Sequence, residues 1–161
     1  MKKLKKASDE FKVGQNNIGW VDSSFTSEFG DDEIEGGSVL KSLKLARSMT
    51  DSEISKEFKV QECTLGDVLE TLKNATGDMK DGYSNLFYVK NHPSHVVNVY
   101  WRARDGAWYV DGWGRGSGAW DAGRRVFSPA TFDSGSSSPK PLDPLKLCQC
   151  DRCGKCGKLI N

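Results

Sequence analysis

The sequence has no long apolar run and almost no net charge. Nowhere do about 18 apolar residues follow one another, so the sequence predicts no membrane-spanning helix. Its 23 Lys and Arg residues are balanced by 22 Asp and Glu residues, and the resulting charge of +1 gives no overall field that would attract nucleic acid or an anionic membrane. A partner of either kind would need a local basic patch.

The sequence also lacks the motifs of the common enzyme classes. It contains no glycine-rich phosphate loop, no nucleophile beside a base, and no pair of carboxylates at a recognisable spacing. The only two histidines, His92 and His95, fall in a turn sequence, where two imidazoles could bind a metal or perform acid–base work. Because no partner carboxylate or nucleophile is near them in the sequence, we predict a protein that is not an enzyme.

The start of the chain lacks the features of a secretory signal. Four lysines lie within the first six residues, but no apolar segment of about 7 to 15 residues follows them. The cysteine count of five is odd, which fits reduced thiols better than a set of disulfides. We therefore expect a cytoplasmic protein that does not associate with a membrane, and the sequence makes no prediction of its oligomeric state.

Four of the five cysteines are crowded into residues 148–161, and they are Cys148, Cys150, Cys153 and Cys156. Cys-x-x-Cys-Gly turns of this kind supply zinc ligands, so we predict a zinc-binding tail. All four ligands from nine residues would strain a tetrahedron, so Cys63, His92, His95 or a second chain would help complete the site. The alternatives are an iron–sulfur cluster, for which the Cys-x-x-Cys-x-x-Cys spacing is also typical, and a tail that binds no metal.

Composition and pattern divide the chain into four segments. With 161 residues, 37% hydrophobic and 28% charged, it has room for one compact core and some appendages. Residues 1–38 are polar and show no long apolar period, which predicts a flexible lead with one docking segment around residues 20–29. Residues 39–130 carry the periodic patterns of a folded domain. A Ser/Pro linker at residues 131–147 then leads to the cysteine tail at residues 148–161.

Two helix starts are visible in the domain. Thr50 and Glu53 form a capping box, and Thr64 and Asp67 repeat the pattern. After the second cap, four apolar residues recur at helical spacing, which predicts one buried stripe: Leu65, Val68, Leu69 and Leu72. We predict two short helices joined by a tight turn.

The period changes to two after residue 77. Strands are predicted at residues 86–90, 96–104, 107–111 and 124–127. The dipeptide Asp105-Gly106 predicts a two-residue hairpin loop, in which Ala103 would pair with Trp108 and Arg102 with Tyr109. The expected core side carries Trp101, Ala103, Trp108 and Val110. The fold class we predict is α+β, with a two-helix hairpin packed on a small antiparallel β-meander.

Four segments resemble an uncharacterised family of small hypothetical proteins from bacterial candidate phyla. They are Leu45–Ile54, Cys63–Leu69, and the segments Trp108–Trp113 and Trp120–Ser128. The resemblance is collinear over about residues 40–130. It implies a domain boundary and no known activity, and both the lead and the cysteine tail fall outside it.

The opposite face of the predicted hairpin suggests a binding surface. Aromatic and guanidinium groups there could stack on a partner, and they are Tyr100, Arg102, Arg104 and Tyr109. Trp113, in the glycine-rich segment that follows, is a further candidate partner-binding residue, as a ligand or interface anchor. In the simpler interpretation, Arg102 only packs on Tyr109. We predict a non-enzymatic binding module with a partner that is protein or nucleic acid. The alternatives are a helix-turn-helix-like DNA-binding regulator that uses the helix pair and a single-stranded nucleic-acid binder that uses this face. Cys63 is expected to be a small buried core residue.

Overall fold

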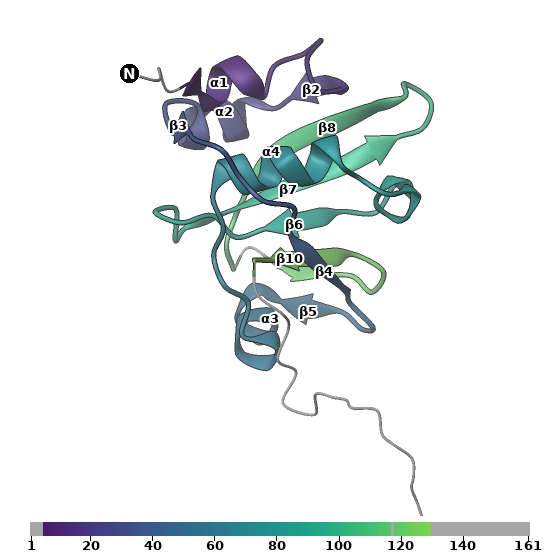
Figure 1. Ribbon diagram of the computed structural model, residues 1–161. Helices are drawn as coiled ribbons and strands as arrows, with labels where there is room; N and C mark the ends of the chain where they lie inside the picture. The colour runs from purple at the N-terminus through teal and green to yellow at the C-terminus, as the bar shows by residue number, and fades with distance from the viewer. Residues whose placement is uncertain (1–4, 117, 130–161) are drawn as a thin grey trace, which may run out of the picture.

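The computed structural model describes residues 5–116 and 118–129 (Figure 1). The predicted α+β class is confirmed. The α-helices in this part of the chain are α1 (Ala7–Glu10), α2 (Ser23–Phe29), α3 (Asp51–Phe58) and α4 (Leu65–Lys73), with a 3₁₀ turn at Gly77–Lys80. The strands are β1 (Lys5–Lys6), β2 (Ile18–Val21), β3 (Glu33–Ile34), β4 (Lys41–Lys44), β5 (Met49–Thr50), β6 (Asn85–Phe87), β7 (His95–Arg102), β8 (Ala107–Gly114), β9 (Ala119–Trp120) and β10 (Arg125–Ser128).

A mixed sheet of six strands forms the centre of the fold, in the order β2-β8-β7-β6-β10-β4. The β2–β8 and β6–β10 pairs are parallel, and the other neighbours are antiparallel. Two small antiparallel sheets, β1–β3 and β5–β9, lie beside it. The predicted small antiparallel meander therefore differs from the observed sheet, which has six strands and includes two parallel pairs. β10 inserts between β6 and β4, and β2 and β4 come from earlier in the chain, which short-range patterns do not indicate.

Helix α4 covers one face of the sheet, called here the α4 face. Its apolar stripe of Leu65, Val68, Leu69 and Leu72 packs on Phe87, Val97, Val99, Trp108, Val110 and Phe127. Phe11, Phe25 and Phe29 from the N-terminal segment join the same core. Alternation along each strand puts every second side chain on this face, so the intervening residues form the opposite face. The α4 face is where most of the hydrophobic core lies.

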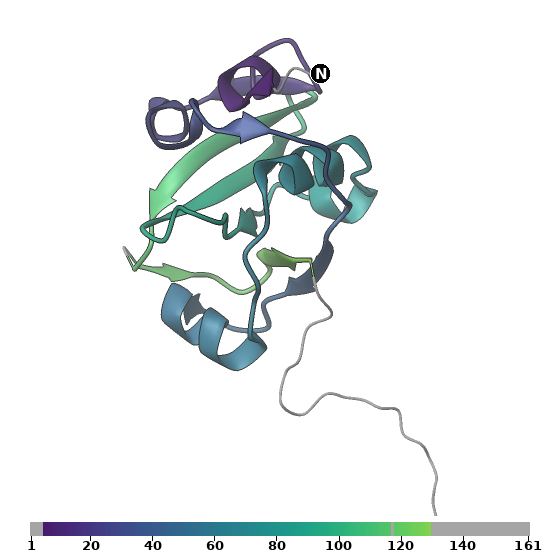
Figure 2. The ribbon, with the colours of Figure 1, turned by 60° about the vertical axis from the view of Figure 1, so that its left-hand side comes forward.

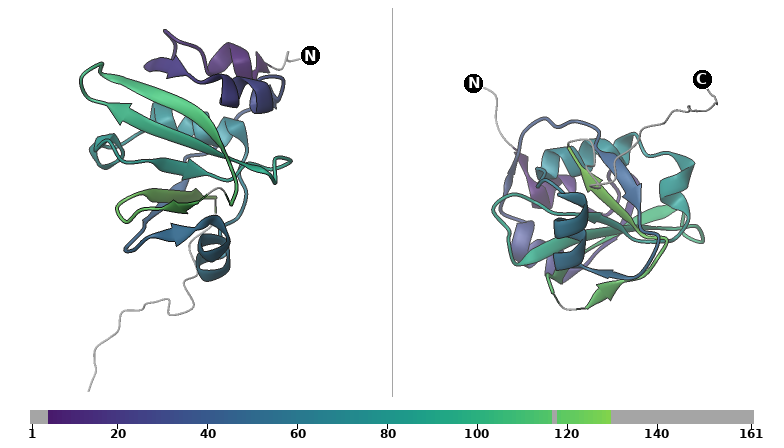
Figure 3. Two further views of the ribbon diagram at one scale, coloured as in Figure 1. Left: turned by 180° about the vertical axis from the view of Figure 1, so that it is seen from behind. Right: turned by 90° about the horizontal axis from the view of Figure 1, so that it is seen from below.

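Helix α3 covers only part of that opposite face, called here the α3 face (Figure 2). Ile54 packs there with Leu45, Met49, Leu86, Tyr88, Val96 and Val126. Seen from behind, β7 and β8 are not crossed by any helix of the described residues (Figure 3, left). The α3 face is thus apolar and covered at one end and open at the other.

Both predicted capping boxes are confirmed. The Thr50 hydroxyl accepts from the Glu53 amide while the Glu53 carboxylate accepts from the Thr50 amide, and Thr64 and Asp67 repeat this exchange. The predicted hairpin between the two helices is wrong. After α3 the chain runs beside the end of β6, where the Cys63 amide donates to the Tyr88 carbonyl, and α4 then packs on the other face.

The predicted flexible lead is also wrong for the part of it that the structure describes. Residues 5–34 form three strands and two helices, and β2 is an edge strand of the main sheet. Phe11, Ile18, Phe25 and Phe29 are buried. Each short element supplies only one or two of these anchors, so no long apolar period exists for a sequence pattern to detect.

The β7–β8 hairpin has a longer loop than predicted. Arg102 pairs with Ala107 and Trp101 with Trp108, which leaves residues 103–106 in the loop, and Gly106 adopts a positive φ of 60°. The register therefore differs by two residues from the predicted one. Because side chains alternate with a period of two, this shift keeps every strand residue on its predicted face. Trp108 and Val110 lie on the core side as expected, and Ala103 lies in the turn.

Two glycines permit a close crossing that fixes the segment before β4. A side chain on Gly37 would lie 2.2 Å from the backbone of Gly66 in α4, and one on Gly66 would lie 2.4 Å from the Glu35 carbonyl oxygen. Both positions therefore exclude any larger residue. No helix among the described residues has the length and apolar character that a bilayer-spanning segment requires.

Candidate functional site

The open part of the α3 face is built by β7 and β8. Asn98, Tyr100 and Arg102 project from β7 on the side opposite the buried Val97 and Val99. On β8, Tyr109, Asp111 and Trp113 lie on the same side, and the register pairs Asn98 with Asp111 and Tyr100 with Tyr109. The hairpin thus presents amide, carboxylate and aromatic groups side by side.

A pocket of about 540 Å³ lies at the boundary between the open and covered parts of this face. We call it the Asp111 pocket. Three aromatic side chains and several polar groups line it, together with residues of the loops around it: Gly82, Ser84, Asn98, Tyr100, Asp111, Trp113, Gly118, Ala119, Trp120, Asp121 and Arg124. Its volume is in the range of pockets that hold small organic ligands, about 300 to 1,000 Å³.

Two oxygen atoms in this pocket have no hydrogen-bond partner within the described residues. They are Oδ1 of Asn98 and Oδ1 of Asp111, and both are covered from solvent. The Asn98 side chain is 4% exposed. Since a carboxylate can only accept, the Asn98 side chain interacts with Asp111 through its NH₂ group, and the Asn98 oxygen is the acceptor that has no partner. Unpaired buried acceptors are rare, because their desolvation is not compensated.

Burial raises the pKa of Asp111 to about 6. The Asn98 and Trp113 side chains, which donate toward the carboxylate, lower that pKa in part, and the nearby Asp22 carboxylate raises it further. Asp111 therefore changes charge close to neutral pH. A largely buried carboxylate with a raised pKa in an aromatic pocket is typical of a binding or acid–base site.

A buried carboxylate holds Trp120, which forms one wall of the pocket. Asp51, at the first turn of α3, is 7% exposed and accepts from three donors. They are the Tyr88 hydroxyl at 2.6 Å, the Trp120 indole N–H at 2.8 Å and the Gly116 amide at 2.7 Å. Trp120 in turn meets Trp113 edge to face, with 5.9 Å between the ring centroids. The Trp120 wall is therefore fixed by the fold.

The remaining charged groups around the pocket are paired with one another. Arg124 Nη1 lies 2.9 Å from Asp121 Oδ2, and its Nε donates to the Ser84 hydroxyl. Arg102 lies over the Tyr109 ring and 3.8 Å from Asp105 Oδ2. No ion pair joins Asp111 or Asp22 to a cation within the described residues. Asp111 and Asp22 are left as the uncompensated charges.

A second hollow of about 330 Å³ adjoins the first and shares Asp111 and Trp113 with it. Its other lining residues are Trp20, Asp22, Ser24 and Gly112. Trp20 extends the aromatic row, with its ring centroid 5.5 Å from that of Tyr109. The Asp22 carboxylate caps α2 by accepting from the Ser24 amide, and the Ser24 side chain and then this amide lower the pKa of Asp22. Asp22 therefore stays ionised at neutral pH.

The predicted partner-binding residues are placed in three different settings. Tyr100 and Trp113 line the Asp111 pocket. Tyr109 and Arg102 lie beside it and engage each other and Asp105, as the simpler interpretation expected. Arg104 lies in the exposed turn, away from the strands. The rings of Tyr100 and Tyr109 are tilted by 40°, so these residues do not form one flat stacking platform.

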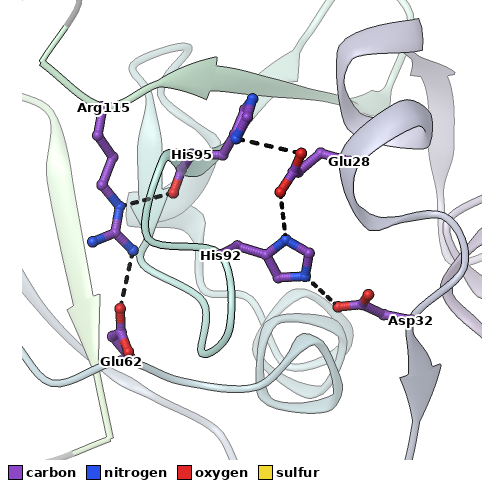
Figure 4. A network of polar contacts seen from close by, with 6 residues as sticks. All are labelled: Glu28, Asp32, Glu62, His92, His95 and Arg115. Atoms are coloured by element: carbon purple, nitrogen blue, oxygen red, sulfur yellow. Dashed lines mark hydrogen bonds and ion pairs between the residues drawn. The ribbon is translucent and has the colours of Figure 1, made fainter.

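The two histidines form a separate cluster with Glu28 and Asp32 (Figure 4). His92 is 7% exposed, and its Nδ1 and Nε2 lie 2.7 Å from Glu28 and 2.5 Å from Asp32. His95 Nδ1 lies 3.5 Å from the other Glu28 oxygen, which is an ion-pair contact beyond good hydrogen-bond geometry. Helix α2 and the residues after it thus supply the carboxylates that the sequence near His92 lacks.

His92 acts as a charged clamp in this arrangement. Burial by itself lowers the pKa of His92, but the hydrogen bonds with Glu28 and Asp32 raise it more, so that pKa lies above its ordinary value of 6.5. Carboxylates only accept, so a ring bonded to one on each side must donate from both nitrogens as imidazolium. Within the described part of the chain, no three His, Cys, Asp or Glu residues are arranged to hold a metal ion.

Two other predicted features can be placed briefly. Cys63 is buried and free, and burial raises the pKa of its thiol to about 12, which fits the expected core residue. The predicted metal ligands Cys148, Cys150, Cys153 and Cys156 lie outside the described residues, and the zinc and iron–sulfur hypotheses stay predictions. Comparison of the chain with protein-family models, curated proteins and solved structures finds no match.

Sequence reasoning missed Asn98, Asp111, Trp120 and Asp51. One signal was present for Asn98, since it interrupts the apolar strand sequence Val96-Val97-Asn98-Val99 with an amide. Asp111 falls within the predicted strand at residues 107–111 but was not singled out. The role of Asp51 depends on partners 37 to 69 residues away, which no local pattern indicates.

Proposed function

We propose that this protein is a non-enzymatic binding module that takes up a small ligand, or a side chain of a partner, in the Asp111 pocket. The observation that supports this most directly is the pair of unpartnered oxygens of Asn98 and Asp111 in an aromatic-walled pocket. Folded proteins pair nearly all of their buried polar groups. A ligand that donates hydrogen bonds would complete both.

The charge of the site argues against the nucleic-acid alternatives. The uncompensated carboxylates Asp22 and Asp111 would repel phosphate groups, which provide most of the affinity for single or double strands. The helix pair gives no support for DNA recognition either, because α3 and α4 pack on opposite faces of the sheet.

Proton-detected NMR of the full chain tests the proposal. Four probes would be titrated in turn: glucose, AMP, benzoate and a tripeptide Gly-Lys-Gly with blocked termini. We expect at least one probe to shift the Asn98 amide and the Trp113 indole resonances. The Trp101 indole is the internal control, because Trp101 packs against Trp108 on the α4 face under Lys80. If no probe shifts the pocket resonances, or if Trp101 shifts equally, the proposal fails.

A further inference from the structure

The Asp111 pocket carries enough chemistry to specify the class of its ligand. We infer that it binds a primary ammonium group, from an alkylamine or from a lysine side chain, with the Asp111 carboxylate and the Asn98 carbonyl oxygen as acceptors. This inference rests on the proposed function of the same pocket and deepens it.

The hydrogen-bonding character of the pocket is the first argument. Both oxygens without a partner, Asn98 Oδ1 and Asp111 Oδ1, are acceptors, so what they require is a donor. They come from directly paired residues on neighbouring strands, which brings them to the same side of the sheet. An ammonium group carries three donors at one point and can serve both.

The electrostatic character of the pocket is the second argument. Asp111 and the nearby Asp22 have no cationic partner among the described residues, while Arg124 and Arg102 are already paired with Asp121 and Asp105. Tyr100, Trp113 and Trp120 add the negative faces of their rings to the walls. Aromatic faces and carboxylates both attract a cation, and they disfavour an anionic ligand.

The need for N–H donors separates this ligand from a quaternary ammonium. A trimethylammonium group would gain from the rings but would leave the Asn98 and Asp111 oxygens without a donor. Both oxygens are covered from solvent, so a ligand must also displace a lining group. Trp113 is the most exposed of the large lining residues, at 46%, and is the group we expect to move.

Peptide titrations followed by NMR test the inference on the full chain. The probes are blocked Gly-Lys-Gly, the same peptide with norleucine or with trimethyllysine in place of lysine, and n-butylammonium. We expect the lysine peptide to bind at least tenfold more tightly than the norleucine and trimethyllysine peptides, with shifts at the Asn98 amide and Trp113 indole. Binding of n-butylammonium within tenfold of the lysine peptide identifies a free amine as a sufficient ligand. Binding of the lysine peptide alone identifies a polypeptide source, and both results support the inference.

A pair of variants tests whether binding depends on the carboxylate in the Asp111 pocket or only on the overall charge of the protein. Asp111→Asn should weaken the lysine peptide at least tenfold, whereas Asp9→Asn, which removes one exposed carboxylate from α1, should change the affinity less than twofold. The affinity of the wild-type protein for the lysine peptide should rise from pH 5 to pH 7, because Asp111 ionises in this range. The titratable and charged groups around Asp111 are Asp22, Tyr100, Arg102, Asp121 and Arg124. The rise in affinity should be absent in Asp111→Asn. The wild-type peptide series stays decisive even if Asp111→Asn folds poorly.

The outcomes separate a wrong ligand class from a wrong binding function. Equal binding of the norleucine or trimethyllysine peptide overturns the ammonium assignment. Binding of glucose, AMP or benzoate at the pocket, with no binding of either amine, also overturns it and leaves the binding function in place. If no probe shifts the pocket resonances, both the function and the ligand class fall.

Discussion

Asp51 and Asp111 are two largely buried carboxylates on the same side of the sheet, and their surroundings differ in one respect. Asp51 accepts from a hydroxyl, an indole and a backbone amide. Asp111 has an oxygen with no partner in the described residues, beside an Asn98 oxygen in the same condition. The comparison teaches that a saturated polar cluster holds the fold, whereas an unsaturated one in a pocket is suited to a ligand.

Removal of the saturated carboxylate should have the largest effect. Asp51→Ala leaves the Tyr88 hydroxyl, the Trp120 indole and the Gly116 amide without their acceptor, and we expect a loss of about 3 to 5 kcal/mol in the free energy of unfolding. Urea denaturation measures it. The charge-matched control Asp9→Asn should lie within about 0.5 kcal/mol of wild type. A loss below about 1 kcal/mol for Asp51→Ala would mean that the cluster does not hold the fold.

The His92 clamp extends the comparison to a second saturated cluster. The pKa of His92 is higher in the folded protein than its ordinary value of 6.5 in the unfolded chain. The stabilisation that the charged His92 provides is therefore fully present below pH 6.5, and it is lost as the pH rises through the pKa of the folded state. We expect His92→Gln to cost about 2 kcal/mol at pH 5.5 and distinctly less at pH 9. Thermal denaturation at both pH values checks this. An equal cost at both would contradict a charged clamp.

Replacement of Asp111, the carboxylate that has an oxygen without a partner, should stabilise the protein instead of destabilising it. Because the folded pKa of Asp111 lies at about 6, above its ordinary value of 3.8, wild-type stability falls as the pH rises between these values. Asp111→Asn removes this penalty. Allowing for partial solvent screening, we expect the variant to be about 1 to 2 kcal/mol more stable than wild type at pH 8 and equal to it below pH 4. If Asp111→Asn is less stable than wild type at pH 8, Asp111 stabilises the fold as Asp51 does, and the comparison is wrong.

Trp113 should matter less for stability than Asp51. Its ring is 46% exposed, so Trp113→Ala should lower the free energy of unfolding by about 1 to 2 kcal/mol. The same change removes one wall of the pocket and should weaken any bound probe severalfold. Denaturation and NMR titration of one preparation measure both quantities. A large loss of stability with unchanged binding would reverse the roles assigned to this residue.

The sequence predicted those features of the fold that depend on neighbours along the chain. Both capping boxes, the stripe of α4 and the facing of β7 and β8 were correct, because each rests on a spacing of a few residues. The predicted hairpin loop was two residues too short. Each strand residue was still assigned to the correct face, because a register shift of two residues does not change the face on which a side chain lies. The parallel pairs with β2 and β10 are long-range contacts that local spacing does not determine.

The candidate site was predicted only in part, for a related reason. Tyr100 was identified as a binding residue because it is an aromatic residue on the outer face of a predicted strand, and Trp113 because it is an aromatic residue in a glycine-rich segment. Asn98 and Asp111 were not, since their importance lies in hydrogen bonds that are missing from the folded state, and a sequence does not display missing partners. His92 was set aside for want of a nearby carboxylate, but Glu28 and Asp32 reach it from α2 and the residues after it.

A carboxyl-detected NMR titration of Asp111, with and without saturating blocked Gly-Lys-Gly, tests the central claim most directly. An ammonium group beside the carboxylate favours its charged form. The account predicts a pKa of about 6 for the protein alone and a clearly lower pKa in the presence of the peptide. A pKa that stays the same or rises when the peptide is bound would contradict it.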